Sequence, residues 1–244
     1  MEPVTDLLER PTYSMRDVDQ LLRLPFGTAR RWIDGYAVKG HRYPPVVRLD
    51  SSGDDVVTWG EFVEARLLAE YRRGGALMIN MHRSVERLRA ELGTRYPLAH
   101  AHTWIQPEGR ELVRRVQVDA GVATSYLLVV ARNDQLVLSH QAETFVASVD
   151  FSSQITDDPV VERVFPRPDL KDVVFDPRRK SGLPVIAGRG IPTAVIAEQM
   201  RAGDSVASIA DAYELDTSQV EAAIRFELLQ AASSASDGGT SAVA

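Results

Sequence analysis

The chain contains no cysteine, which removes several kinds of chemistry before any motif is considered. Disulfide bonds, thiolate metal sites and a cysteine nucleophile all require this residue. The sequence also lacks an apolar run long enough to span a bilayer. Its first ten residues are acidic and lack the apolar core of a signal peptide. Together these absences predict a cytoplasmic protein without disulfides that does not enter a membrane.

An overall basic excess is missing as well, since the formal net charge is −6. A dedicated nucleic-acid coat protein would be strongly basic, so any nucleic-acid binding must be local. Residues 23–48 hold six basic residues against one acidic residue, a local charge of +5. Residues 202–229 hold one basic residue against six acidic residues, a local charge of −5. We therefore expect the two ends of the chain to bind different partners.

Signatures of catalysis are absent too. The sequence has no nucleophile elbow, no phosphate-binding loop and no zinc motif. His100, His102 and His140 lack a further ligand at metal-binding spacing, and Gly188-Arg189-Gly190 is interpreted as a structural turn. The sequence therefore predicts a protein that is not an enzyme and that has no metal site and no cofactor.

Residues 12–48 have the pattern of two short helices joined by a tight turn. Ser14 and Asp17 are spaced as a capping box, and Leu24-Pro25 supplies the turn. The second helix is expected to begin near Phe26. Its buried face would hold Phe26, Ala29, Trp32 and Ile33, and its exposed face Gly27, Thr28, Arg30, Arg31 and Asp34. A helix divided in this way can enter the major groove of DNA.

Two short strands at 46–49 and 56–58 are predicted to follow this helix as a small wing. The arrangement resembles the winged helix-turn-helix of MerR-like regulators, and operator binding by a dimer is expected. The predicted DNA-binding residues are Arg23, Gly27, Thr28, Arg30, Arg31, Lys39, Arg42 and Arg48. The alternative is a small helical subdomain whose arginines are only solvated.

The middle of the chain is predicted to hold two helices followed by a small antiparallel sheet. The helices are expected at 59–73 and 77–92, and the resemblance implies that they dimerise. Strands are expected at 98–105, 110–118, 125–131 and 135–139, followed by a short helix at 140–149. The proline-bearing segment 152–172 is expected to be an extended linker, with an edge strand possible at 160–165, and the tail from Ala231 to be disordered.

The predicted fold class is therefore α+β. It combines an N-terminal winged helix-turn-helix, a small antiparallel sheet with helices in the middle, and a C-terminal three-helix domain that is helix-turn-helix-like. The predicted boundaries are 1–95 for the DNA-binding region with its dimerising helices, 96–151 for the sheet, 152–172 for the linker, 173–230 for the C-terminal domain and 231–244 for the tail.

Residues 182–226 carry the most specific pattern in the chain. A loop punctuated by glycine and proline, GLPVIAGRGIP, precedes three predicted helices separated by Gly203-Asp204-Ser205 and Asp216-Thr217. The loop, the glycine-to-serine turn and the final V-E-A-A-I-R-F helix resemble a domain of unknown function that recurs in VapB-type antitoxins. Gly190 stands where that family usually has a larger residue.

This resemblance implies an antitoxin that binds and neutralises a VapC-like PIN-domain ribonuclease and represses its own operon. Homodimers, and hetero-oligomers with the toxin, are then expected. The predicted toxin-binding residues are Arg178, Arg179, Lys180, Arg189, Ile191 and Pro192. Two alternatives remain at this point, a stand-alone MerR-like transcriptional regulator without a toxin and an adaptor that binds only protein.

Overall fold

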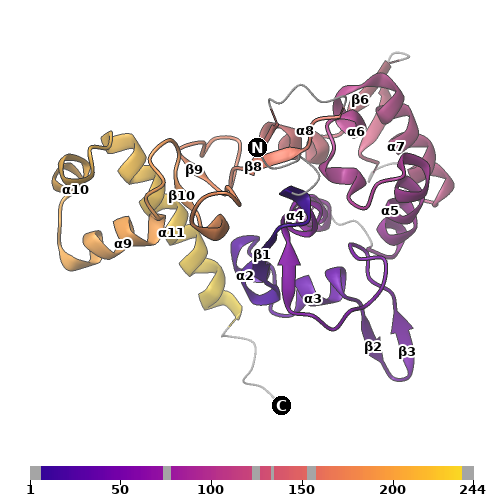
Figure 1. The fold of residues 1–244 in the computed structure, drawn as a ribbon, viewed down its shortest axis with the longest axis horizontal. Helices are drawn as coiled ribbons and strands as arrows, with labels where there is room; N and C mark the ends of the chain where they lie inside the picture. The colour runs from indigo at the N-terminus through magenta and orange to yellow at the C-terminus, as the bar shows by residue number, and fades with distance from the viewer. Residues whose placement is uncertain (1–6, 74–77, 123–126, 133–134, 153–157, 238–244) are drawn as a thin grey trace. The chain divides into compact units, whose positions relative to one another are not determined.

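The computed structural model describes residues 7–73, 78–122, 127–132, 135–152 and 158–237. The chain divides into two compact units, Met1–Glu162 and Arg163–Ala244. Helices combine with two-stranded sheets in both units, so the predicted α+β class is confirmed (Figure 1). The boundary between the units falls inside the segment that the sequence predicts to be a linker.

The first unit begins with a strand, two short helices and a hairpin. Its elements in order are β1 (Pro11–Ser14), α2 (Met15–Leu21), α3 (Thr28–Ile33), β2 (Tyr36–Val38), β3 (His41–Tyr43) and β4 (Val56–Thr58). β1 pairs with β4, and β2 pairs with β3, both antiparallel. The predicted strand at 46–49 is wrong. The N–H groups of Val46 and Val47 instead donate to the Trp32 carbonyl at 2.7 and 3.0 Å, which holds the chain against the end of α3.

The caps and buried faces of α2 and α3 follow the predicted pattern, except at Phe26. Ser14 Oγ accepts the Asp17 N–H at 3.2 Å and Asp17 Oδ2 accepts the Ser14 N–H at 2.9 Å, which confirms the capping box. Phe26, expected in the core, is 79% exposed. The reason is that Gly27 has a φ of 78° and α3 begins only at Thr28, so Phe26 precedes the helix and does not share its buried face.

The rest of the first unit is mainly helical. Its elements are α4 (Trp59–Arg73), α5 (Met78–Leu92), the 3-10 helix η1 (Pro97–Ala99), α6 (His102–Ile105), α7 (Pro107–Asp119), β5 (Val129–Arg132), β6 (Gln135–Leu138), α8 (His140–Ala147), β7 (Val149–Phe151) and the start of β8 (Val161–Val164). β5 pairs with β6, and β7 pairs with β8. α4 is buried along most of its length, and Trp59 donates its indole N–H to the Val161 carbonyl at 2.8 Å. The predicted helices at 59–73 and 77–92 are confirmed within the described residues, and the helix predicted at 140–149 is present over 140–147, because Val149 begins β7.

Two of the predicted strands, at 98–105 and 110–118, are wrong. These residues form η1, α6 and α7, and Pro107 occupies the first turn of α7, where a missing N–H breaks no hydrogen bond. The buried positions of α7 and its end follow helical spacing: Val113, Val116, Gln117 and Ala120. Val118, which contributed to the strand-like alternation, is 50% exposed. The predicted strands at 125–131 and 135–139 are present as the β5–β6 pair within the described residues.

The second unit combines a short hairpin with three helices. Its elements are β9 (Val173–Val174), the 3-10 turn η3 (Lys180–Gly182), β10 (Val185–Ile186), α9 (Thr193–Ala202), α10 (Val206–Tyr213) and α11 (Thr217–Asp237). Gly203 ends α9 with a φ of 103°, and Ser205 Oγ caps α10 by accepting the Ser208 N–H at 3.1 Å. The core between hairpin and helices is formed by Ile186, Ile196, Ile209, Ala210, Leu215, Val220 and Ala223.

The predicted disorder from Ala231 is wrong for residues 231–237, because α11 continues to Asp237. Alanine favours the helix strongly, and serine is tolerated where an established helix only has to be extended. Residues 238–244, which begin with Gly238-Gly239, lie outside the described part. Among the described residues, no helix combines the length and apolar character needed to cross a membrane.

Candidate nucleic-acid interface and C-terminal loop

The buried carboxylate of Asp19 sets the geometry of the two short N-terminal helices. Asp19 lies on α2 and is 5% exposed. Its Oδ2 accepts the Gly27 N–H and its Oδ1 accepts the Ala29 N–H, both at 2.6 Å. These N–H groups at the start of α3 have no partner within the helix, so the carboxylate satisfies them and also offsets the positive end of the helix. One side chain therefore caps α3 and ties it to α2.

The exposed side of α3 presents two arginines, as the sequence predicts. Arg30 pairs with Asp55 at 2.6 Å and its side chain remains 44% exposed. Arg31 is exposed, and its guanidinium donates to the Gly27 carbonyl and to Thr28 Oγ1, each at 3.2 Å. Thr28 itself is only 8% exposed. The helix therefore offers guanidinium groups to solvent, while Gly27 and Thr28 support them.

The β2–β3 hairpin carries the other exposed basic residues. Lys39 and Gly40 form its two-residue loop with φ values of 49° and 81°, the conformation that matches the twist of paired strands. Lys39 lies in this loop and Arg42 on β3, and both are exposed. At the base of the hairpin the Tyr36 and Tyr43 rings stack 4.6 Å apart. The hairpin projects from the body of the first unit beyond α3 (Figure 1), a position that the sequence assigned to the strands at 46–49 and 56–58.

Arg48, predicted to face DNA, is buried instead. Its guanidinium binds Glu61 at 2.9 Å and Asp34 at 3.0 Å, and its side chain is 6% exposed. Burial alone would lower the pKa of Arg48, but the hydrogen bonds and charges of Glu61 and Asp34 outweigh it and raise the pKa. Arg48 thus closes the loop that follows α3. Arg23, another predicted contact, lies half-buried just beyond α2 with a φ of 53°.

In the second unit, the structure brings together two basic segments that are separate in sequence. Arg178, Arg179, Lys180 and Arg189 are all exposed. A Cβ placed on Gly190 would lie 3.7 Å from Arg179 Nη1, so the loop at 188–190 runs beside the basic run. Ion pairs here are long: Arg179 lies 3.7 Å from Asp176 and Arg189 lies 3.8 Å from Glu214. The Arg189–Glu214 pair is exposed on both sides and therefore weak, and the side chain of Arg179 is itself 53% exposed, so both guanidinium groups remain accessible to a partner.

Ile191 and Pro192, also predicted to bind toxin, are half-buried and hold the loop closed. The Ile191 carbonyl accepts the Ile186 N–H at 2.8 Å, and Ile191 packs against the core of the helices. Pro192 forms an isolated bridge with Val185. These contacts close the loop that carries Arg189.

The histidines considered as metal ligands have other partners. His100 Nδ1 lies 2.7 Å from Asp158 Oδ2, and His102 Nδ1 lies 2.6 Å from Gln106 Oε1. Across the described residues, no group of three histidine, aspartate or glutamate side chains is placed to hold a metal ion. The pKa of Asp158 is lowered, because the bonds to His100 and the His102 N–H outweigh its burial, which alone would raise it.

Comparison with known proteins gives one domain match and one relative that shows the family of the chain. Residues 173–226 match the model of a domain described as "Protein of unknown function (DUF433)". The chain is 32% identical over 228 residues to the "Uncharacterized protein Rv2308" of Mycobacterium tuberculosis, covering 91% of this chain and 92% of that protein. The chain therefore belongs to the same family as Rv2308.

Two further relatives come from the same organism. The chain is 26% identical over 228 residues to a protein named "Putative antitoxin VapB45", with 88% of this chain and 92% of that protein covered. The crystal structure of Rv2018 superposes with a TM-score of 0.70 at 24% identity, covering 88% of this chain and 97% of that chain. At this identity the likeness to Rv2018 establishes a shared fold.

Proposed function

We propose that this protein is the antitoxin of a type II toxin–antitoxin system, with its first unit binding operator DNA and its second unit binding the toxin. The observation that carries the proposal is the similarity to "Putative antitoxin VapB45", which extends over 88% of the chain and so includes both units. The opposite local charges of residues 23–48 and 202–229 support a separate partner for each end.

The surface that would meet DNA is formed by α3 and the β2–β3 hairpin. Arg30 and Arg31 lie on the exposed side of a helix whose position Asp19 fixes, and this suits contacts with guanine edges or phosphates. Phe26, 79% exposed just before α3, would contact a thymine methyl group. Lys39 and Arg42 on the hairpin would contact phosphates beside the groove. A homodimer would place two such surfaces on a palindromic operator.

The surface that would meet the toxin is formed by the basic run and the neighbouring loop of the second unit. By family resemblance the toxin is a VapC-like PIN-domain ribonuclease, whose catalysis depends on acidic residues around a metal ion. Arg178, Arg179, Lys180 and Arg189 offer charged donors suited to carboxylates, and Arg189 stands on a loop held closed by Ile191. Occupying the acidic cleft with these side chains would block access of RNA.

Co-purification tests the proposal directly. The full chain would be expressed with the adjacent open reading frame, with a tag on one of the two proteins only. We expect a stable complex with a small PIN-like protein and a shift of the operon's own promoter DNA. If the chain purifies alone and still shifts that DNA, it is a stand-alone MerR-like regulator and the antitoxin proposal is wrong.

Substitutions then locate the toxin surface. Arg189→Ala and the triple variant Arg178→Ala/Arg179→Ala/Lys180→Ala should weaken toxin binding and restore ribonuclease activity in the mixture. Arg225→Ala is the matched control, because Arg225 is an exposed arginine on α11 of the same unit. Unchanged inhibition by both basic variants would move the toxin contact to another surface.

A further inference from the structure

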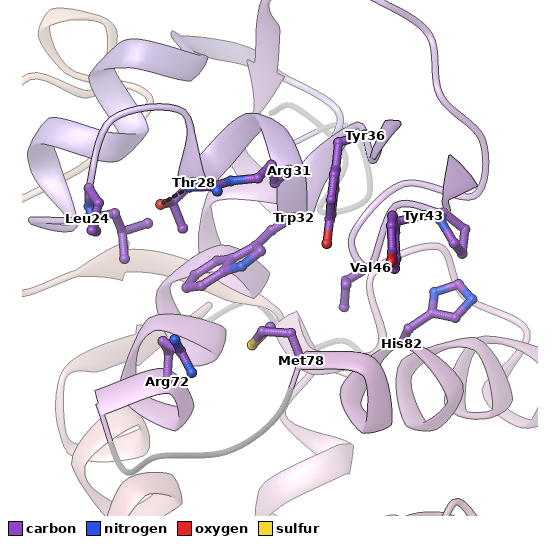
Figure 2. Close-up of a pocket in the computed structure, with 12 residues that line it drawn as sticks. Leu24, Thr28, Arg31, Trp32, Tyr36, Tyr43, Val46, Arg72, Met78 and His82 are labelled. Atoms are coloured by element: carbon purple, nitrogen blue, oxygen red, sulfur yellow. Dashed lines mark hydrogen bonds between the residues drawn. The ribbon is translucent and has the colours of Figure 1, made fainter. Parts of the chain in front are cut away.

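The first unit contains a cavity of about 520 Å³ beside α3, well within the size range of small-molecule sites. It is bounded by the turn before α3, by α3 itself, by the base of the β2–β3 hairpin and by the facing ends of α4 and α5. Its lining residues are Leu24, Pro25, Thr28, Arg31, Trp32, Tyr36, Tyr43, Pro44, Val46, Arg72, Met78 and His82. Figure 2 shows the Trp32 indole in the middle of these side chains.

The body of the cavity suits a flat apolar group. Three aromatic rings line it, and the stacked pair Tyr36 and Tyr43 forms one wall with Met78 and Trp32 close by (Figure 2). Aromatic faces and a methionine sulfur pack favourably against another aromatic ring. The indole N–H of Trp32 makes no hydrogen bond with any described residue, which leaves a donor for an acceptor atom on a ligand.

The charged residues that line the cavity favour an anionic ligand. Two arginines, Arg31 and Arg72, are among the lining residues, and the lining includes no carboxylate. Arg31 uses two of its nitrogens on Gly27 and Thr28, which leaves further N–H donors of its five. Arg72 is exposed and forms no ion pair with a described residue. A carboxylate on a flat ligand could therefore accept charge-assisted hydrogen bonds from either guanidinium.

We propose that this cavity binds a small aromatic carboxylate and that the bound ligand weakens DNA binding by the first unit. The ring would pack on Trp32 and the tyrosine pair, the carboxylate would pair with Arg72, and the ligand would lie against Arg31. Arg31 belongs both to the cavity and to the exposed side of α3, so a guanidinium engaged with the ligand is withdrawn from DNA. By linkage, DNA would weaken ligand binding by the same factor. This second part rests on the proposed DNA binding, whereas the binding site itself does not.

The site is tested by calorimetric titration of the full chain with 2-naphthoate, using 2-naphthamide as the uncharged ligand of matched shape. We expect saturable binding of the carboxylate at one site per chain and binding of the amide at least about tenfold weaker. Arg72→Gln should lower the affinity for 2-naphthoate by about tenfold, within the range of a charge-assisted hydrogen bond. Arg83→Gln should leave it unchanged, because Arg83 is an exposed arginine on α5 outside the lining.

Equal binding of carboxylate and amide, or equal affinities of the two variants, would overturn the site. Circular dichroism melting of both variants establishes that they are folded. The coupling is tested separately by gel shift of the promoter DNA with and without saturating 2-naphthoate, which should weaken binding in the wild type and much less in Arg72→Gln. A promoter affinity that 2-naphthoate leaves unchanged would overturn the coupling. Absence of any DNA shift would overturn the proposed function, whereas the calorimetric result for the site would stand.

Discussion

The two units of this protein build short helices in opposite ways. In the first unit, charged side chains inside the fold hold the helix ends: Asp19 caps α3, and Arg48 binds Asp34 and Glu61. In the second unit, the helices meet through an aliphatic core that includes Ile196, and an exposed serine caps α10. The surfaces are opposite as well, with a local charge of +5 over residues 23–48 and of −5 over residues 202–229.

This difference fits the different roles that we propose for the two units. A helix that must meet a polyanion needs its arginines exposed and its own position fixed from within. Buried ion pairs and tertiary caps provide that fixing, although they are costly to disrupt. A unit that meets a protein can rely on apolar packing and leave its charges at the surface. The substitutions below test this contrast, from the largest expected effect to the smallest.

Arg48→Met should be the most damaging change in the first unit. It leaves Asp34 and Glu61 buried without their partner, and breaking a buried pair in this way costs about 3–5 kcal/mol. Urea unfolding followed by tryptophan fluorescence measures this, because Trp32, Trp59 and Trp104 all lie in the first unit. Arg42→Met, on the exposed hairpin, is the control and should shift the unfolding free energy by less than about 0.5 kcal/mol. Equal losses for the two variants would contradict the division into buried and exposed arginines.

Glu64 should make the stability of the first unit depend on pH. Burial raises the pKa of Glu64 to about 7, although the charge of Arg89 and the Leu98 N–H act in the opposite direction. A carboxyl group whose pKa is raised in the folded state stabilises the fold fully when the pH is below its pKa in the unfolded chain. This contribution is lost as the pH rises through the folded-state pKa of about 7. The unfolding free energy should therefore fall by roughly 3 kcal/mol between pH 4.5 and pH 7.

The measurement is urea unfolding at several pH values in that window, on the wild type and on Glu64→Gln. The amide cannot titrate, so the variant should show a much flatter dependence. The same slope in both proteins would mean that another group is responsible.

Asp19→Ala should cost more than removal of a cap in the second unit. It leaves two N–H groups at the start of α3 without their acceptor, and the loss should approach the upper end of the range of about 0.5–2 kcal/mol for helix caps. Ser205→Ala removes one exposed acceptor from α10 and should lie near the lower end of that range. Amide hydrogen exchange measures the two losses of stability, in α3 for Asp19→Ala and in α10 for Ser205→Ala. A larger effect of Ser205→Ala would reverse the comparison.

Arg30→Ala and Arg31→Ala should leave stability almost unchanged and weaken DNA binding by roughly 1–3 kcal/mol if the contact is to a base. If the contact is to phosphate instead, the slope of the logarithm of affinity against the logarithm of salt concentration should also fall by about 1. The gel-shift midpoint as a function of salt measures both. Arg225→Ala in the second unit is the control and should have no effect on DNA binding. Unaltered midpoints for both α3 variants would reject this recognition surface.

The sequence predicted local features well wherever a cap and a helical period agree. Ser14 and Asp17, Gly203 and Ser205 mark helix ends that the structure confirms. The strand predicted at 110–118 failed because valines spaced for a helix also produce a partial alternation, and Val118 added to it although it is exposed. Local spacing alone does not distinguish these two periods.

The candidate sites depended on contacts between residues distant in sequence, which local patterns do not contain. In the sequence, Arg48 is one of the basic residues counted toward the local charge of +5. Only the fold shows that it is buried beside Glu61. Asp19 gave no signal of its role, because its partners at the start of α3 lie eight and ten residues away. The cavity joins residues between Leu24 and Val46 to Arg72, Met78 and His82, and no periodicity relates these segments.

The most direct test of separate partners for the two units is a crossed binding experiment on the full chain. Arg30→Ala/Arg31→Ala and the quadruple variant Arg178→Ala/Arg179→Ala/Lys180→Ala/Arg189→Ala would each be co-expressed with the adjacent open reading frame. Promoter DNA and co-purified toxin would then be measured for both. The first variant should lose DNA and keep the toxin, and the second should lose the toxin and keep DNA. If one of the variants lost both DNA and toxin, or if the two variants each kept both partners, the division of function between the units would be contradicted.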